Sequence, residues 1–92
     1  MPRLVTTVIR METPERFTAS LAQVVAAQIK SAGLSQRDMA TRTGVPLVTL
    51  SRRITGRSPF TVAELATIAS VLGVSVVDLV LKAERAIAPS AA

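Results

Sequence analysis

Residues 34–56, LSQRDMATRTGVPLVTLSRRITG, hold the signals for two short helices with a tight turn between them. Ser35 and Asp38 have the spacing of a capping box, in which each side chain accepts from the other residue's backbone N–H, so a helix should begin there. Gly44 should end that helix, because glycine adopts the left-handed conformation of a helix stop without steric cost. Met39 lies inside this helix and should face the core.

The second helix is predicted over residues 46–55, because the segment opens with proline, which is tolerated only in the first turn of a helix. Consecutive helical residues point about 100° apart. Leu50 and Ile54 therefore share the buried side, and Arg52 points roughly the opposite way. Arg53 falls at the edge of the buried side, so its stem should pack while its charged end reaches outward.

Positive charge is concentrated in the same stretch. Residues 35–58 carry a net charge of +4 out of the +5 of the whole chain, because five arginines there face a single acid, Asp38. The five are Arg37, Arg42, Arg52, Arg53 and Arg57. A protein-interaction module can also have a solvated basic face. The coincidence of the charge with two closely spaced helices instead favours a polyanionic partner, double-stranded DNA.

The two helices resemble the helix-turn-helix of the lambda-repressor and Cro-like regulators, also called Xre-type. The matching positions are Gln36, Ala40, Gly44, Val45, Thr49, Leu50, Ser51, Arg52 and Gly56. The similarity extends over about residues 13–81 and implies an all-α, five-helix DNA-binding domain. In that family the second helix enters the major groove. The resemblance therefore implies a sequence-specific transcriptional regulator with helix 46–55 in the groove.

Rotation of the second helix and the resemblance together predict the residues that meet DNA. Base contacts are predicted for Leu47, Val48, Thr49, Ser51 and Arg52. Phosphate contacts are predicted for Gln36, Arg37, Arg42, Arg53, Thr55, Arg57 and Ser58. Rotation selects Arg52 as the principal base reader. The phosphate role of Gln36, at the start of the first of the two helices, is implied by the resemblance.

Two places depart from the usual pattern of that family. Leu47 and Val48 replace residues that are usually polar, often glutamine, which predicts apolar contact with thymine methyl groups instead of a bidentate bond to adenine. Arg53 replaces a residue that is usually apolar. The buried register of this helix should therefore be shifted by one residue, with Ile54 in the apolar role.

Composition limits the class of protein. The 92 residues suffice for one helical domain, and 49% of them are apolar, with Phe17 and Phe60 as the only aromatics. The chain has no cysteine and no histidine, which excludes disulfides and removes the commonest metal ligand and general base. We therefore expect no enzyme, metal, cofactor or small-molecule ligand. No apolar run has the length of a membrane span, so the expected location is the cytoplasm.

Helix starts are predicted at three more places. They are Thr13 followed by Pro14, the pair Thr61 and Glu64, and the pair Ser75 and Asp78. Proline at the first helical position and the capping-box spacing are both typical of helix starts. Together with the two helices above they give five helices within residues 13–88, followed by a frayed tail, 89–92. The buried stripe of the fourth helix is predicted to include Val62.

Residues 1–12 form a separate N-terminal segment. Its stretch 4–9, LVTTVI, is rich in β-branched residues and typical of a short strand. Three roles fit it: pairing with its copy in a second subunit, an arm that carries Arg3 and Arg10 to DNA, or a disordered piece upstream of an internal start at Met11. Pairing across a homodimer is favoured.

The last predicted helix has more apolar surface than one buried side needs, so a second copy or the N-terminal segment should cover the rest. The predicted dimer contacts are Val5, Val8, Ile9, Val77 and Leu81. A dimer would read an operator that is an inverted repeat. The favoured function is a repressor, of phage or host, that occupies its operator. The alternatives are an antitoxin or accessory regulator that also binds a partner protein, and a protein-only adaptor.

Overall fold

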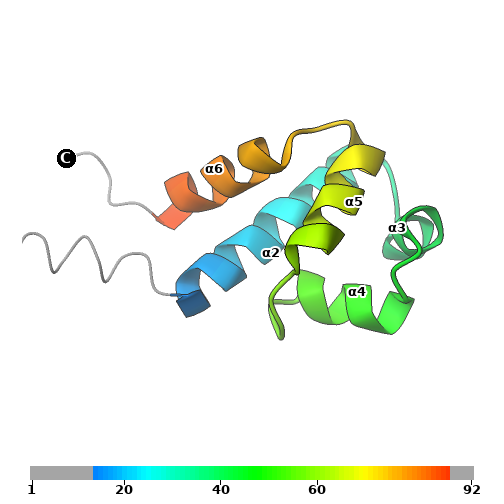
Figure 1. Ribbon diagram of the computed structural model, residues 1–92, viewed down its shortest axis with the longest axis horizontal. Helices are drawn as coiled ribbons and strands as arrows, with labels where there is room; N and C mark the ends of the chain where they lie inside the picture. Colours follow the sequence, from blue (N-terminus) through cyan, green and yellow to red (C-terminus); the bar gives the residue numbers. More distant parts are fainter. Residues whose placement is uncertain (1–13, 88–92) are drawn as a thin grey trace, which may run out of the picture.

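The computed structural model describes residues 14–87, which form five helices and contain no strand (Figure 1). The helices are α2 (Pro14–Ser31), α3 (Gln36–Thr43), α4 (Leu47–Ile54), α5 (Val62–Leu72) and α6 (Val76–Ile87). The predicted all-α, five-helix domain is confirmed. The predicted N-terminal strand, the contacts Val5, Val8 and Ile9, and the cap Thr13 lie outside the described residues.

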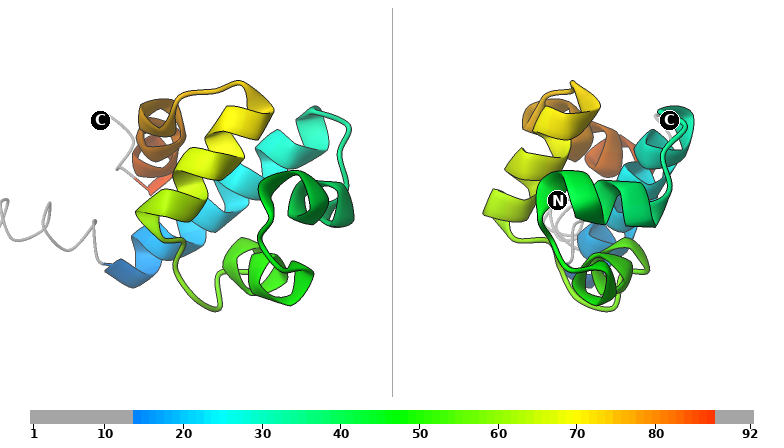
Figure 2. Two further views of the ribbon diagram at one scale, coloured as in Figure 1. Left: turned by 45° about the vertical axis from the view of Figure 1, so that its right-hand side comes forward. Right: turned by 90° about the vertical axis from the view of Figure 1, so that its right-hand side faces the viewer.

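The long helix α2 runs through the middle of the domain, and α6 returns beside it in the opposite direction (Figure 1). Inside this contact the buried hydroxyl of Ser20 donates to the carbonyl oxygen of Ala83 at 2.7 Å. Figure 2 shows α4 on the opposite side of α2 from α6, and α3 lies next to α4. The two helices of the predicted DNA-binding unit are therefore well separated from α6.

All five helices contribute to one buried core. Each helix contributes one large side chain that is fully buried: Val25, Met39, Leu50, Ile68 and Leu79, in chain order. Burial of each such side chain is worth about 1.5 to 3 kcal/mol, so the short helices α3 and α4 are held mainly by this shared core. The predicted inward positions of Met39 and Leu50 are confirmed.

Two capping boxes are confirmed as predicted. In the first, the Asp38 N–H donates to Ser35 Oγ at 3.0 Å and the Ser35 N–H donates to Asp38 Oδ2 at 2.9 Å. Thr61 and Glu64 make the same reciprocal pair at the start of α5. Gly44 ends α3 with a φ of 78°, a left-handed conformation that glycine adopts without steric cost.

Three local predictions need correction. Helix α4 is one residue shorter at each end than the predicted 46–55, because Pro46 has an extended ψ of 141° and serves as the N-cap. Val62 opens α5 on its outer side and is 79% exposed, so it is not part of the buried stripe. At the start of α6 the hydroxyl of Ser75 accepts from the N–H of Val77, one residue earlier than in a capping box.

Helix α6 leaves apolar side chains uncovered on its outer face. Val77 is 65% exposed and Leu81 is 39% exposed, whereas Leu79 is fully buried. No single helix among residues 14–87 is long and apolar enough to cross a membrane; α5 and α6 meet that test only as a pair, which is bent by 105°. The two exposed residues are four positions apart, so they share one face of α6.

The bond between α2 and α6 gives a prediction about stability. Ser20→Ala should lower the free energy of unfolding by about 1 kcal/mol, because it removes one buried hydrogen bond without opening a large cavity. Urea unfolding followed by circular dichroism measures the loss. The matched control is Ser70→Ala on the exposed side of α5. Equal stability of the two variants would contradict a role for the Ser20 bond.

Candidate nucleic-acid interface

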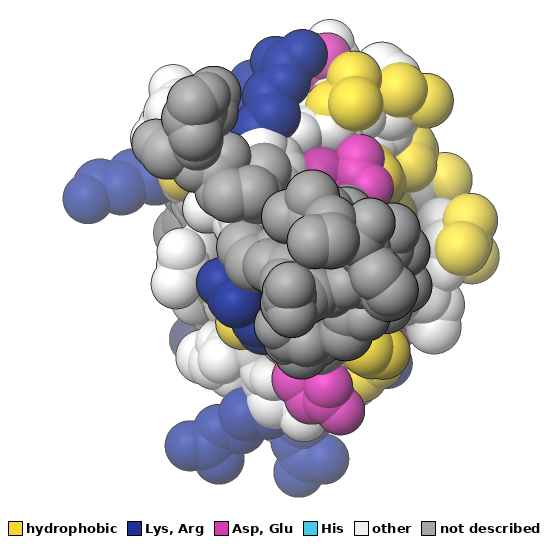
Figure 3. Space-filling view, turned by 90° about the vertical axis from the view of Figure 1, so that its left-hand side faces the viewer, with side chains coloured by type: hydrophobic (Ala, Val, Ile, Leu, Met, Phe, Trp, Pro, Cys, Tyr) yellow, Lys and Arg dark blue, Asp and Glu magenta, His cyan; other side chains and the backbone are white. Residues whose placement is uncertain are grey.

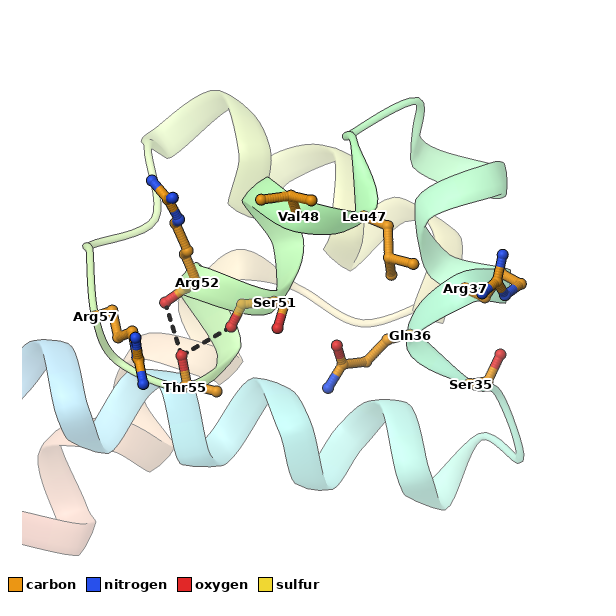
Figure 4. Close-up of a pocket in the computed structure, with 9 residues that line it drawn as sticks. All are labelled: Ser35, Gln36, Arg37, Leu47, Val48, Ser51, Arg52, Thr55 and Arg57. Carbon is orange, nitrogen blue, oxygen red and sulfur yellow. Dashed lines mark hydrogen bonds between the residues drawn. The ribbon is translucent and has the colours of Figure 1, made fainter.

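An open cleft of about 700 Å³ lies between the start of α3, the outer face of α4 and the loop that follows α4 (Figure 4). Its lining residues are Ser35, Gln36, Arg37, Leu47, Val48, Ser51, Arg52, Thr55 and Arg57. Most of the residues predicted to meet DNA are therefore brought together. Thr49, Arg42, Arg53 and Ser58 are the predicted contacts that do not line the cleft. No acid is among the lining residues.

The outer face of α4 is arranged as rotation predicted. Leu50 is fully buried, and Val48 is 67% exposed. Arg52, four residues after Val48, is exposed on the same outer face of the helix (Figure 4). Leu47 is half-buried and lines the cleft. Ile54 packs against the core, which confirms the predicted shift of the apolar position by one residue.

A side-chain bond fixes the turn between α3 and α4. The hydroxyl of Thr43 donates to the carbonyl of Met39 at 2.6 Å and accepts from the N–H of Val45 at 3.2 Å. It thereby gives an acceptor to the Val45 N–H, which lies in the turn between α3 and α4, outside the hydrogen-bond pattern of either helix. Val45 also packs against the core. The angle between α3 and α4 is therefore set by Thr43, Gly44 and Val45, and sequence reasoning had not assigned a role to Thr43.

The loop after α4 folds back on the helix end. Gly56 has a φ of 79°, and the N–H groups of Arg57 and Ser58 donate to the carbonyl of Arg52 at 2.9 and 3.4 Å. The Thr55 hydroxyl lies within donating distance of two α4 carbonyls, at 2.9 and 3.3 Å (dashed in Figure 4). Because the Thr55 hydroxyl donates its proton to α4, only its acceptor lone pairs remain. A phosphate oxygen is also an acceptor, so it does not bond to them. The structure therefore gives Thr55 a capping role in place of the predicted phosphate contact.

A family model described as helix-turn-helix matches residues 25–79, a span that includes α3 and α4. The chain belongs to the helix-turn-helix family. The resemblance inferred from the sequence is thereby confirmed. By position, α4 corresponds to the second helix of the motif, which in this family lies in the major groove of DNA, and the family supports a DNA-binding regulator of transcription.

Two solved structures have a similar fold, both of the clp gene regulator ClgR from Corynebacterium glutamicum. One is 25% identical with a TM-score of 0.75, over 86% of this chain and 100% of that chain. The other is 24% identical with a TM-score of 0.73, over 77% of this chain and 76% of that chain. A search of curated proteins gave no match.

Arg53 of α4 does not line the cleft. Its Nε donates to Glu64 Oε1 at 2.8 Å and its Nη2 donates to Glu64 Oε2 at 3.2 Å, which makes a bidentate ion pair between α4 and α5. Its Nη1 donates to Ser58 Oγ at 2.7 Å. The side chains of Arg53 and Glu64 are only 20% and 18% exposed. The predicted phosphate contact of Arg53 is therefore corrected, because its guanidinium is engaged inside the protein.

Hydrogen bonds keep two of the acids near the motif ionised. The guanidinium of Arg53 is the main cause that lowers the pKa of Glu64, and the Thr61 N–H adds to it. The backbone N–H of Ser35, followed by its hydroxyl, lowers the pKa of Asp38. Since Glu64 offsets the charge of Arg53, the positive charge of the cleft comes from Arg37, Arg52 and Arg57. In Figure 3, basic side chains stand at the lower edge, the side of α4.

Residues 14–87 contain no group of three or more acids that could hold a metal ion, and the whole chain lacks histidine and cysteine. The lining of the cleft offers cations, hydroxyls, one amide and two apolar side chains. These groups bind a surface by charge, hydrogen bonds and apolar contact. The cleft is therefore suited to recognition of a polyanion.

The ion pair between Arg53 and Glu64 gives a prediction about pH. Because the folded pKa of Glu64 lies below its ordinary 4.5, the ionised carboxylate stabilises the fold above that pH, and the contribution is lost as the pH falls through the lower folded value. Glu64→Gln should therefore cost about 1 kcal/mol of unfolding free energy at neutral pH, and this difference should shrink below about pH 4. Urea unfolding at several pH values measures it.

The control is Glu84→Gln, which removes an exposed carboxylate from α6. Its unfolding free energy should stay close to that of the unmodified chain at every pH. A loss in Glu64→Gln that is the same at pH 3 and pH 7 would show that the carboxylate charge contributes nothing.

Proposed function

We propose that this chain is a sequence-specific repressor that places α4 in the major groove of double-stranded DNA and acts by occupying its operator in the cytoplasm. The observation that carries the proposal is the exposed pair of Val48 and Arg52 on the recognition helix, beside a cleft lined by three arginines and no acid. A major groove about 12 Å wide admits such a helix. Occupancy needs binding alone, with no catalytic step.

Base recognition is assigned to the exposed side of α4. Arg52 fits a bidentate bond to guanine O6 and N7, the commonest specific contact in the major groove. Val48 and Leu47 fit thymine methyl groups, because neither offers a hydrogen bond. Ser51 lines the cleft between them and can bond a base edge through its hydroxyl. Thr49 is half-buried outside the cleft, so we give it a minor part.

Phosphate contacts are assigned to groups on both sides of the recognition helix. Gln36 opens α3, where unpaired backbone N–H groups favour an anion. Arg37 and Arg57 line the cleft, and Arg42 is exposed in the last turn of α3. Arg53 is left out, since Glu64 and Ser58 hold its guanidinium. These side chains orient α4 on the duplex without reading its sequence.

We also propose a homodimer joined through the exposed face of α6, around Val77 and Leu81. An α4 of eight residues is about 12 Å long and can meet only a few base pairs, so two copies are needed for strong discrimination. The operator should then be an inverted repeat with half-site centres about 34 Å apart. The same exposed face supports the second candidate, an accessory regulator that binds a different protein there.

DNA binding is tested by fluorescence anisotropy with a duplex selected from a random library. Affinity should fall with salt, and Arg57→Ala should reduce the log–log slope by about 0.9 on every sequence, because one phosphate contact is lost. Arg52→Ala should cost about 1 to 3 kcal/mol at one base pair, a G·C, and relax the preference there.

The two arginine variants serve as controls for each other, since they remove the same charge from the same cleft. Uniform weakening by Arg52→Ala, with the preferred sequence unchanged, would mean that the recognition face is misplaced. A salt slope near zero for the unmodified chain would overturn the assignment to DNA.

The dimer is tested by light scattering on Leu81→Glu. A carboxylate placed in an apolar interface is costly, so this variant should be monomeric at concentrations where the unmodified chain is dimeric. The matched control is Val62→Glu, at an exposed valine on α5 away from this face. A monomer for the unmodified chain at high micromolar concentration would reject the dimer and favour the accessory regulator.

A further inference from the structure

The carboxylate of Glu64 joins α4 to the start of α5 across the loop between them. Glu64 Oε1 accepts from Arg53 Nε at 2.8 Å and also from the Thr61 N–H at 3.0 Å, while the Thr61 hydroxyl accepts from the Glu64 N–H at 3.0 Å. Glu64 is thus fixed by the first turn of α5, and it fixes Arg53 in turn. The ion pair between Arg53 and Glu64 therefore links the last turn of α4 to the first turn of α5, across the loop of residues 55–61.

Ser58 belongs to the same hydrogen-bond network, because it also bonds Arg53. Its oxygen accepts from Arg53 Nη1 at 2.7 Å, so its own proton is left to donate. A hydroxyl that accepts from a cation is also polarised into a better donor. The backbone N–H groups of Ser58 and Arg57 are tied to the Arg52 carbonyl. The network therefore sets both the direction of the Ser58 hydroxyl and the path of the loop that carries Arg57.

The Ser58 hydroxyl lies at a groove where it can donate its proton to a bound anion. It lines, with Arg57, a groove between the loop and the first turn of α2. Glu15 is the one acid among the residues that line this groove. Glu15 repels an anion, so a phosphate is expected on the side of this groove where Arg57 lies. Arg57 is also the residue that the groove shares with the cleft of α4.

From these contacts we propose that Arg53 and Glu64 are positioning residues that hold the Ser58 hydroxyl and Arg57 ready for one DNA phosphate, without touching DNA themselves. The inference rests on the proposed function, and it adds a phosphate contact beside the cleft of α4 that an internal ion pair positions. Arginine is suited to this part because its planar fork serves three acceptors at fixed angles, which lysine cannot do.

The decisive variant is Glu64→Gln, because the two explanations of Arg53 predict opposite signs. Removing an acid makes the chain more positive and, by charge alone, should tighten binding to DNA. Loss of the positioning pair should instead weaken it about five- to tenfold, the value of one hydrogen bond. The control Glu84→Gln changes the charge equally on α6, away from the loop. Anisotropy at neutral pH and low temperature, with folding checked by circular dichroism, measures both.

A second variant keeps the test decisive if Glu64→Gln does not fold. Arg53→Lys retains the charge but lacks the planar fork that bonds both oxygens of Glu64 and also Ser58 at fixed angles, so it should also bind about five- to tenfold more weakly. Ser58→Ala should cause a similar loss alone and almost no further loss when added to Arg53→Lys. If Arg53 contacted a phosphate directly, Arg53→Lys would bind like the unmodified chain, and Ser58→Ala would cause its full loss when added to Arg53→Lys.

The outcomes separate this inference from the proposed function. Absence of DNA binding by the unmodified chain overturns the proposed function and the inference with it. Binding by the unmodified chain together with unchanged or tighter binding by Glu64→Gln overturns the inference alone. Weaker binding by both Glu64→Gln and Arg53→Lys, with non-additive Ser58→Ala, supports it.

Discussion

The packing of Leu50 into the core is the contact on which the outer face of α4, the proposed recognition surface, depends. A helix of eight residues is not stable alone in water, so α4 keeps its shape only where its buried side is held. Leu50 is its one fully buried side chain, with Ile54 packed beside it. This contact fixes the rotation of α4 about its axis. Val48 and Arg52 then face outward because they lie opposite the anchor.

The second constraint acts at the two ends of α4. At its start, Thr43 bonds the N–H of Val45 and so sets the turn from α3. At its end, Arg53 bonds Glu64 and sets the approach of α5. An eight-residue element is therefore clamped at its middle and at both ends. Such preorganisation favours affinity, because little ordering remains to be done when DNA binds.

Local signals made the starts of α3 and α5 and the outward face of α4 predictable from the sequence. The capping boxes at Ser35 and Thr61 need only residues three apart, and the outward direction of Arg52 follows from helical rotation. The ion pair of Arg53 was not predictable in the same way, because it joins residues eleven positions apart across a loop whose path the sequence does not reveal. An arginine at a usually apolar position was the available signal, and it was interpreted as a DNA contact.

The hydroxyl of Thr55 shows a second limit of sequence reasoning. Its position at the end of α4 favours a phosphate, yet its hydroxyl donates toward the carbonyls of Ser51 and Arg52. Threonine near a helix end commonly bonds a carbonyl of the preceding turn, and rotation alone does not distinguish the two uses. The sequence was enough to predict which helices form the motif, whereas the direction of the Thr55 side chain was seen only in the structure.

The central claim is that α4, flanked by the start of α3 and the loop after α4, is the surface that meets DNA. Titration of the ¹⁵N-labelled chain with a library-selected duplex, followed by amide chemical shifts, tests it most directly. The account predicts the largest changes at residues 35–37 and 47–58. Largest changes on α6, with residues 47–52 unmoved, would contradict it.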